Sequence, residues 1–387
     1  MFIRAKLLEP TKYKTKNDSL SVLLNEIIET IEAFAPPAYQ ESYDNAGLQV
    51  GNTEDAVTGV LITLDVTEAI LDEAIERGCN LIVAHHPLIF SGLKRISGRN
   101  YVERVVQKAI KNDISIYAAH TNLDNMSYGV STKIAEKLGL INTSVLAPRA
   151  NTLSKLYTYV PVAVADKVRE AMFAAGAGHI SNYKECSFNT DGTGTFRGEA
   201  GTHPAIGQGG GKREQVQEVK IEVLVQQHLQ GRVLKALFDN HIYEEVAYEL
   251  IPLANTNQNI GAGMVGNLPE AMTETDFMAW LKRQMKTDCI RHTELLSRNI
   301  KKVALCGGSG SFLLKDAIRA GADVFITGDF KYHQFFDAEA KIIIADIGHY
   351  ESEQFTSEIF ESLLKEKFPT FAILLSNLNT NPVKYYY

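Results

Sequence analysis

Short apolar runs alternate with amphipathic stretches along the first 150 residues of the chain. The apolar runs are bounded by polar or glycine-containing segments, and the amphipathic stretches carry apolar residues every three or four positions. This alternation is typical of βαβ units, in which neighbouring strands are parallel. Residues 17–150 are therefore expected to fold around a mostly parallel sheet. The predicted strands are 59–65, 80–86 and 114–120, and the predicted helices are 20–34, 68–77 and 101–111.

The same pattern returns near the C-terminus, where apolar runs at 302–307, 323–328 and 341–346 predict strands separated by helices. Residues 71–86 (LDEAIERGCNLIVAHH) align with residues 314–329 (LKDAIRAGADVFITGD). In a second echo, HTNLD and HYESE each follow an apolar run and place a carboxylate four residues after a histidine. Residues 255–375 are therefore interpreted as a second copy of the first unit. We expect an α/β core domain of two related βα-repeat halves.

The middle block, residues 151–254, has a different pattern. It predicts strand, helix, strand, a DGTG turn at 191–194, strand, a glycine-rich loop, strand, helix and strand. This is a βαβ–βαβ plan with an extra hairpin, the ferredoxin-like arrangement. The block is therefore interpreted as an α+β insert in the core. Residues 1–16 are basic and lack the apolar region of a secretory signal, so we expect them to lie outside the fold.

Composition and charge restrict the class of partner. The chain has 387 residues, of which 45% are hydrophobic, and a net charge of −7. The negative charge argues against general binding to nucleic acid or anionic lipid, and no apolar stretch approaches membrane-spanning length. Four widely spaced cysteines without a C-x-x-C motif favour reduced thiols in the cytoplasm. We expect a cytoplasmic protein with a small-molecule partner, such as a nucleotide or phosphorylated metabolite.

Six side chains that could bind a metal ion lie at predicted strand ends, where parallel sheets bind ligands. Histidines and carboxylates without cysteine suit zinc, iron, manganese or cobalt. The four-residue step from His349 to Glu353 puts both on one face of a predicted helix. His85 and His86 would face opposite sides of a regular strand, and both can point into one cleft only if the strand ends there, as Pro87 indicates. Any one histidine could be structural, but six such residues together favour metal binding. The predicted ligands are His85, His86, Asp124, His349 and Glu353.

Three further groups are candidates for other roles around these ligands. His120 is expected to hold a bound water or Asp124, or to transfer protons. The backbone N–H groups of the glycine-rich turn CGGSGS could bind a phosphate, although a plain tight connection explains the turn equally well. In the loop GDFKYHQ, His333 could donate a proton, or the loop could simply be a surface loop. The predicted substrate- or anion-binding residues are Gly307, Gly308, Ser309, Gly310, Asp329 and Lys331.

Seven stretches together resemble one family. They are ESYDNAGLQVG (41–51), LDVT (64–67), AHHP (84–87), HTNLD (120–124), GGSG (307–310), TGDFKYH (327–333) and GHYESE (348–353). In this order they resemble the GTP cyclohydrolase I type 2 family, also called the Nif-three-like proteins. The resemblance covers both outer blocks, and the middle block is similar to the PII- or CutA-like insert of some bacterial members.

The resemblance implies a dinuclear metal centre, with zinc as the first candidate. It implies that His86 and Asp124 serve one ion, that His85 and His349 serve the other, and that Glu353 bridges them. It also implies a toroidal homohexamer built as a trimer of dimers.

The resemblance further implies GTP cyclohydrolase activity, in which a water activated by two ions attacks the guanine ring and formate leaves. The same ligands would suit a dinuclear phosphohydrolase. A third interpretation is a non-enzymatic metal-binding scaffold or regulator whose insert senses a small molecule. The ligands alone leave the three open.

Overall fold

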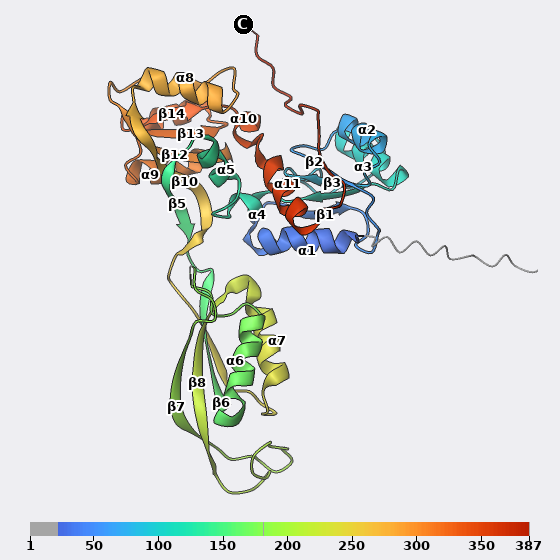
Figure 1. Ribbon diagram of the computed structural model, residues 1–387, viewed down its shortest axis with the longest axis vertical. Coiled ribbons are helices and arrows are strands. Elements are labelled where there is room, and N and C mark those ends of the chain that lie inside the picture. The colour runs from blue at the N-terminus through green and yellow to red at the C-terminus, as the bar shows by residue number, and fades with distance from the viewer. Residues whose placement is uncertain (1–21, 181, 387) are drawn as a thin grey trace, which may run out of the picture.

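The computed structural model describes residues 22–180 and 182–386, and it has an elongated shape (Figure 1). Both ends of the chain build the core, which contains two sheets, and the middle of the chain builds an insert with a third sheet. The core is therefore an α/β fold with two sheets, in which parallel and antiparallel strand pairs are mixed. The predicted leader, residues 1–16, lies outside the described residues.

The first core sheet has the strand order β1-β4-β3-β2-β15. Strands β4, β3, β2 and β15 are parallel, whereas β1 runs antiparallel at the edge. Strands β2, β3 and β4 are buried along their whole length because helices cover both faces of the sheet, which explains their continuous apolar sequences. The elements are α1 (Leu24–Phe34), β1 (Gly47–Val50), β2 (Val60–Thr63), α2 (Glu68–Glu76), β3 (Leu81–Ala84), α3 (Tyr101–Lys111), β4 (Ser115–Ala118), α11 (Thr356–Lys367) and β15 (Ile373–Leu375).

The second core sheet has the order β11-β14-β13-β12-β10-β5. It repeats the plan of the first sheet, since an antiparallel edge strand is followed by three parallel strands in reverse chain order. A 3₁₀ helix, η5 (Tyr332–Ala338), connects β13 to β14 in place of the predicted α-helix. The other elements are α4 (Thr121–Asp124), α5 (Val130–Lys137), β5 (Ile141–Arg149), β10 (Asn257–Met272), α8 (Glu274–Gln284), β11 (Arg291–His292), β12 (Ile300–Ser309), α9 (Leu314–Arg319), β13 (Val324–Gly328), β14 (Ile343–Asp346) and α10 (His349–Glu353).

One hydrophobic cluster joins the two core sheets. It contains Val60 and Ile62 of β2, Val303 of β12, Ile326 of β13 and Phe360 of α11. The intervening residue of β2, Leu61, faces the other way and packs in a separate cluster with α2 and α3, as expected for alternating side chains of a strand. The two halves thus share a buried core, and this holds the carboxyl ends of their strands near one another.

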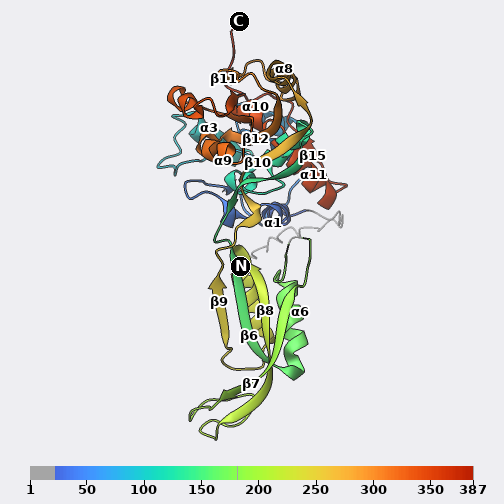
Figure 2. The same ribbon diagram turned by 90° about the vertical axis from the view of Figure 1, so that its left-hand side faces the viewer.

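The insert leaves the core through β5 and returns through β10, which are adjacent antiparallel strands. Its antiparallel sheet has the order β7-β8-β6-β9, and both of its helices contribute to one hydrophobic cluster with the sheet. The insert extends away from the core (Figure 2), and Tyr39 Oη of the core lies 2.7 Å from His228 Nδ1 of the insert. The elements are β6 (Leu153–Pro161), α6 (Ala165–Ala174), β7 (Ser187–Phe196), β8 (Glu214–Gln226), α7 (Gln230–Asn240) and β9 (Tyr248–Pro252).

The predicted DGTG turn at 191–194 is wrong, because β7 runs straight through these residues. Gly194 is needed there for a different reason. A Cβ atom at Gly194 would lie 2.0 Å from Oε2 of Glu218, whose side chain reaches across from β8. The glycine therefore makes room for a cross-strand carboxylate, and the hairpin loop is residues 197–213.

Candidate metal centre

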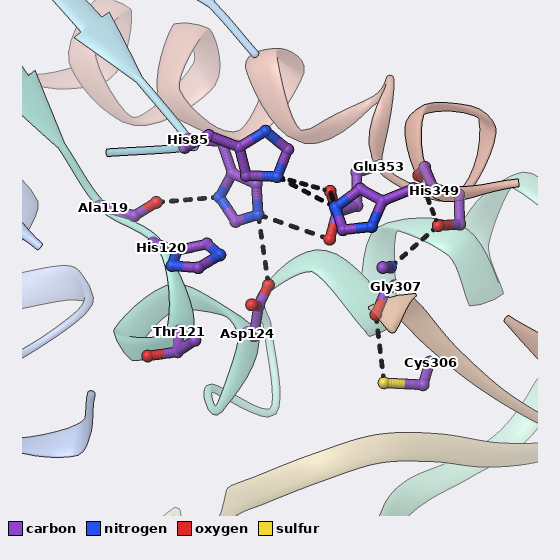
Figure 3. A network of polar contacts seen from close by, with 12 residues as sticks. His85, Ala119, His120, Thr121, Asp124, Cys306, Gly307, His349 and Glu353 are labelled. Carbon is purple, nitrogen blue, oxygen red and sulfur yellow. Dashed lines mark hydrogen bonds and ion pairs between the residues drawn. The ribbon is translucent and has the colours of Figure 1, made fainter. Parts of the chain in front are cut away.

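All five predicted metal ligands come together in the core. Figure 3 shows four of them, His85, Asp124, His349 and Glu353. His85 and His86 directly follow β3, Asp124 ends α4, and α10 carries His349 and Glu353 at its two ends. His85 is fully buried, and the other four line a cavity of about 920 Å³. The predicted long helix from residue 349 is interrupted between α10 and α11, but α10 still contains the four-residue step.

The carboxylate of Glu353 faces three histidines. Its Oε2 lies 2.9 Å from Nε2 of His86 and 3.1 Å from Nε2 of His349. Its Oε1 lies 3.7 Å from Nε2 of His85, which is in turn 3.5 Å from Oδ1 of Asp124. Two groups of ligand atoms therefore share Glu353, and within each group the atoms lie within 4.8 Å of one another. We call His86, His349 and Glu353 the outer triad, and His85, Asp124 and Glu353 the inner triad.

The contacts in the structure differ from the pairing of ligands that the resemblance implies. His86 faces His349, with 3.3 Å between their Nε2 atoms, and not Asp124. His85 faces Asp124 and not His349. The chain turns after β3 so that the adjacent histidines point to different sides of Glu353, each toward a different partner.

The inner triad contains two buried atoms that lack a hydrogen-bond partner among the described residues, His85 Nε2 and Asp124 Oδ1. The Nδ1 of His85 lies 2.9 Å from the carbonyl oxygen of Ala119, which can only accept, so Nδ1 carries the proton. Nε2 is then an acceptor that faces the carboxylate of Asp124, another acceptor. Asp124 is 29% exposed as a side chain, but the Oδ1 that faces His85 is buried. A cation between the two would satisfy both, so this donor set fits a divalent metal ion.

A carboxylate holds each of the other three histidines through its Nδ1 atom. This arrangement fixes the tautomer and leaves Nε2 directed at the centre. The Nδ1–oxygen distances are 2.7 Å from His86 to Asp65, 2.7 Å from His349 to Asp329, and 2.8 Å from His120 to Asp44. Asp44 and Asp65 received no role from the sequence, although both lie in stretches that carry the resemblance. Asp65 is the last residue of the predicted strand 59–65, and in the structure it lies two residues after the end of β2, so its position at a strand end was the signal in the sequence.

In the outer triad, each ionisable group shifts the pKa of its neighbours. Burial opposes protonation of His86 and His349, but hydrogen bonds to Glu353 and to Asp65 or Asp329 outweigh it. They raise the pKa of His86 to about 9 and that of His349 to about 11. Burial likewise opposes ionisation of Glu353, but its histidine partners hold its pKa well below the ordinary value. At neutral pH both imidazoles are therefore protonated beside the ionised Glu353, and a divalent ion would take the place of their Nε2 protons.

The glycine-rich segment supports Glu353 more directly than it offers an anion site. Gly308 has a φ of +58°, and a Cβ atom there would lie 2.3 Å from Oε1 of Glu353. Its N–H donates to Ser352 Oγ at 2.9 Å, and the N–H of Gly310 donates to Thr327 Oγ1 at 2.9 Å. Gly307 and Ser309 line the cavity. The predicted phosphate role therefore finds no free donor at Gly308 or Gly310, and residues 307–309 belong to β12 and not to a helix N-terminus.

The remaining candidates divide into two groups. His120 lines the cavity, and its ring centroid lies 5.3 Å from that of His85 and 5.5 Å from that of His86. Asp329 also lines the cavity, where it orients His349. Lys331 and His333 are exposed and are not among the residues that line the cavity. The structure therefore places His120 and Asp329 at the candidate metal centre, whereas Lys331 and His333 do not line it.

Comparison with known proteins finds similar proteins over more than nine-tenths of the chain. Several curated relatives carry the name GTP cyclohydrolase 1 type 2 homolog. The relative from Halalkalibacterium halodurans is 42% identical, and the alignment covers 92% of this chain and 97% of the relative. The relative from Bacillus subtilis is 39% identical, and the alignment covers 94% of this chain and 98% of the relative. A solved structure of a Bacillus cereus protein related to NIF3 has a TM-score of 0.83 and 41% identity, covering 95% of this chain and 100% of that one.

The Duf34/NIF3 family, described as NGG1p interacting factor 3, matches residues 22–382. This match includes both core sheets, the insert and all five candidate ligands. By sequence and by fold, the chain belongs to the Duf34/NIF3 family.

Proposed function

We propose that this chain is a metal-dependent hydrolase that holds two divalent ions, one in the inner triad and one in the outer triad. The observation that carries the proposal is the pair of facing, buried acceptors, His85 Nε2 and Asp124 Oδ1, beside a carboxylate that also contacts the outer histidines. Zinc is the first candidate because histidine and carboxylate ligands suit it, and iron, manganese and cobalt are alternatives.

Two bound divalent ions supply Lewis-acid polarisation and a water that loses its proton near neutral pH. The chain itself provides the proton transfer. Nδ1–H of His120 donates a hydrogen bond to Asp44 at 2.8 Å, so Nε2 of His120 is free to accept a proton from a reacting group and to deliver it to a leaving group. Asp65 and Asp329 hold His86 and His349 in the orientation that directs Nε2 to the cavity.

The proposed reaction is ring-opening hydrolysis of GTP with release of formate, because the curated relatives are named as homologues of an enzyme with that activity. The test is to load purified protein with zinc, iron, manganese or cobalt and to measure formate release from GTP. Glu353→Ala should abolish the release because it removes a ligand from both triads. Glu361→Ala is the matched control, since Glu361 lies on α11 and pairs only with Lys365 among the described residues.

Other outcomes of this experiment would replace the proposal. Phosphate release from simple esters with GTP untouched would indicate a dinuclear phosphohydrolase. Metal-loaded protein that turns over neither class of substrate would indicate a metal-binding scaffold or regulator.

We further propose that residues 151–254 form a ferredoxin-like domain of the PII or CutA type, inserted in a core of residues 17–150 and 255–375. The element order β6-α6-β7-β8-α7-β9 and the strand order β7-β8-β6-β9 support this proposal. A toroidal homohexamer is part of the same proposal, and light scattering of the purified protein tests it.

A cytoplasmic location is proposed on the state of the cysteines. All four, Cys79, Cys186, Cys289 and Cys306, are free thiols. Among the helices of the described residues, none combines the length and apolar character needed to cross a bilayer. Fractionation of cells that express the tagged chain tests the location.

A further inference from the structure

We propose that Tyr43 and Phe90 form a stacking platform for the planar heteroaromatic ring of the substrate, at the wall of the metal cavity. The inference rests on the proposed function for the identity of the reacting site. Binding of the ring is nevertheless a separate property, which can be measured without any turnover.

Three aromatic rings lead outward from the metal centre. The His120 ring centroid lies 5.5 Å from that of His86, Phe90 lies 6.3 Å from His120, and Tyr43 lies 6.4 Å from Phe90. All four residues line the same cavity. Tyr43 is 64% exposed and Phe90 is 50% exposed, so two large aromatic side chains present their surfaces to the solvent next to the centre. Such surfaces stack readily on a flat ring.

The loops that carry the two rings are tied to each other. The side-chain amide of Asn45 donates to the carbonyl oxygen of Ile89 at 2.5 Å, and Oε1 of Gln49 accepts from the backbone N–H of Ile89 at 3.2 Å. These bonds join the segment after Tyr43 to the segment before Phe90. The platform is therefore held in place before a ligand arrives, which reduces the entropy lost on binding.

The charge of the cavity points to the ring as the recognised part of the substrate. Among the described residues, seven carboxylate side chains line the cavity, and Arg291 is its only arginine or lysine. The guanidinium of Arg291 is already paired with Asp346 and donates to the carbonyl oxygen of Phe330 at 3.0 Å. Apart from bound metal ions, a polyphosphate would thus meet few free cations here. Stacking of a planar ring on Tyr43 and Phe90 does not require positively charged side chains.

The test is equilibrium binding of guanosine to the zinc-loaded, full-length protein, with inorganic tripolyphosphate as a ligand that has no ring. Tyr43→Ala and Phe90→Ala should each weaken guanosine binding by about 10-fold to 100-fold. Zinc content should stay unchanged, and tripolyphosphate should bind wild type and both variants equally weakly. Tyr43→Phe should restore most of the guanosine affinity because it keeps the ring. Tyr101→Ala is the control, since Tyr101 is 56% exposed at the start of α3 and does not line the cavity.

Four results would overturn the inference. If wild-type protein binds no guanosine at millimolar concentration, there is no such platform. If wild type and both alanine variants bind guanosine with equal affinity, the guanine ring binds at another place. Loss of zinc in the alanine variants would show that Tyr43 and Phe90 stabilise the metal centre and do not bind the ligand. A change of oligomeric state would make them an interface between copies of the chain. Platform-dependent guanosine binding without hydrolysis of any nucleotide would instead contradict the proposed function and leave this inference standing.

Discussion

Nε2 of His85 and Oδ1 of Asp124 face each other at 3.5 Å in a buried position, although both are hydrogen-bond acceptors. Without a cation this contact is unfavourable, because two buried lone pairs lack donors. A cation would therefore relieve an unfavourable contact in the inner triad, whereas the histidines of the outer triad already have hydrogen bonds to Glu353.

The two triads predict selective loss of ions. His349→Ala removes a ligand of the outer triad only, so this variant should keep one of two zinc ions per chain. His85→Ala should lose the inner ion, and Glu353→Ala should lose both. Elemental analysis after dialysis measures these contents, with Glu361→Ala expected to retain the wild-type value. If His349→Ala loses both ions while it remains folded, the two triads do not act as separate sites.

The carboxylates behind the histidines predict a graded effect on affinity. Asp329→Asn removes the charge that orients His349 through a 2.7 Å hydrogen bond, while every ligand atom remains. We expect metal affinity to fall by about 10-fold to 100-fold, as is usual for such partners. Competition with a chromogenic chelator measures it. Asp337→Asn serves as the control because Asp337 is exposed and does not line the cavity. If both variants bind the metal with equal affinity, Asp329 does not orient His349 for metal binding.

Gly308 allows a prediction with a closely matched control. Gly308→Ala forces a side chain into the left-handed region at a φ of +58° and directs a Cβ atom at Oε1 of Glu353. Gly321→Ala has a similar φ of +69° but nothing within 4 Å of its Cβ atom. Both variants should lose about 1–2 kcal/mol of stability from the backbone conformation. Only Gly308→Ala should also lose metal, because only there does the new atom displace a ligand.

Denaturant unfolding together with elemental analysis separates the two effects in these glycine variants. Normal metal content in Gly308→Ala would mean that Glu353 moves aside without loss of binding. Reduced metal content in Gly321→Ala would mean that backbone strain alone impairs the site.

The five candidate side chains that the structure brings together were predictable from the sequence, because their choice depends on local rules. Strand ends collect polar residues, and a four-residue step on a helix brings His349 and Glu353 together. The grouping of the ligands was not predictable, since it depends on how the two sheets approach each other across a shared core. His86 meets His349 only through that approach. The second sheet also requires the pairing of β10 with β12 and β5, which no local pattern encodes.

The glycines were misinterpreted for a related reason. Gly194 and Gly308 suggested a turn and a phosphate loop, because glycine is common in both. In the structure each glycine makes room for a carboxylate from a distant segment, Glu218 in the first case and Glu353 in the second. A sequence shows that a position needs glycine, but the atom that a side chain would meet is known only from the fold.

The last prediction concerns the link between α2 and the C-terminal segment, which reaches the metal centre. After β15, Ser376 Oγ and the N–H of Asn377 donate to the carboxylate of Glu73 at 2.5 Å and 2.9 Å. Farther along, Thr380 Oγ1 donates to Asp65, the partner of His86, at 2.6 Å. Glu73 thus anchors the segment that supports the outer triad.

Burial of Glu73 favours its neutral form, but these hydrogen bonds and Arg77 outweigh it and lower the pKa of the carboxyl. A carboxylate with a lowered pKa in the folded state stabilises the protein above the ordinary glutamate pKa of about 4.3, and this contribution is lost as the pH falls through the folded value. Glu73→Gln should therefore cost about 1–3 kcal/mol at neutral pH and less in acid. Urea unfolding at both pH values measures the difference. Glu76→Gln, at an exposed position of the same helix, is the control, and an equal cost in the two variants at neutral pH would show that Glu73 is no anchor.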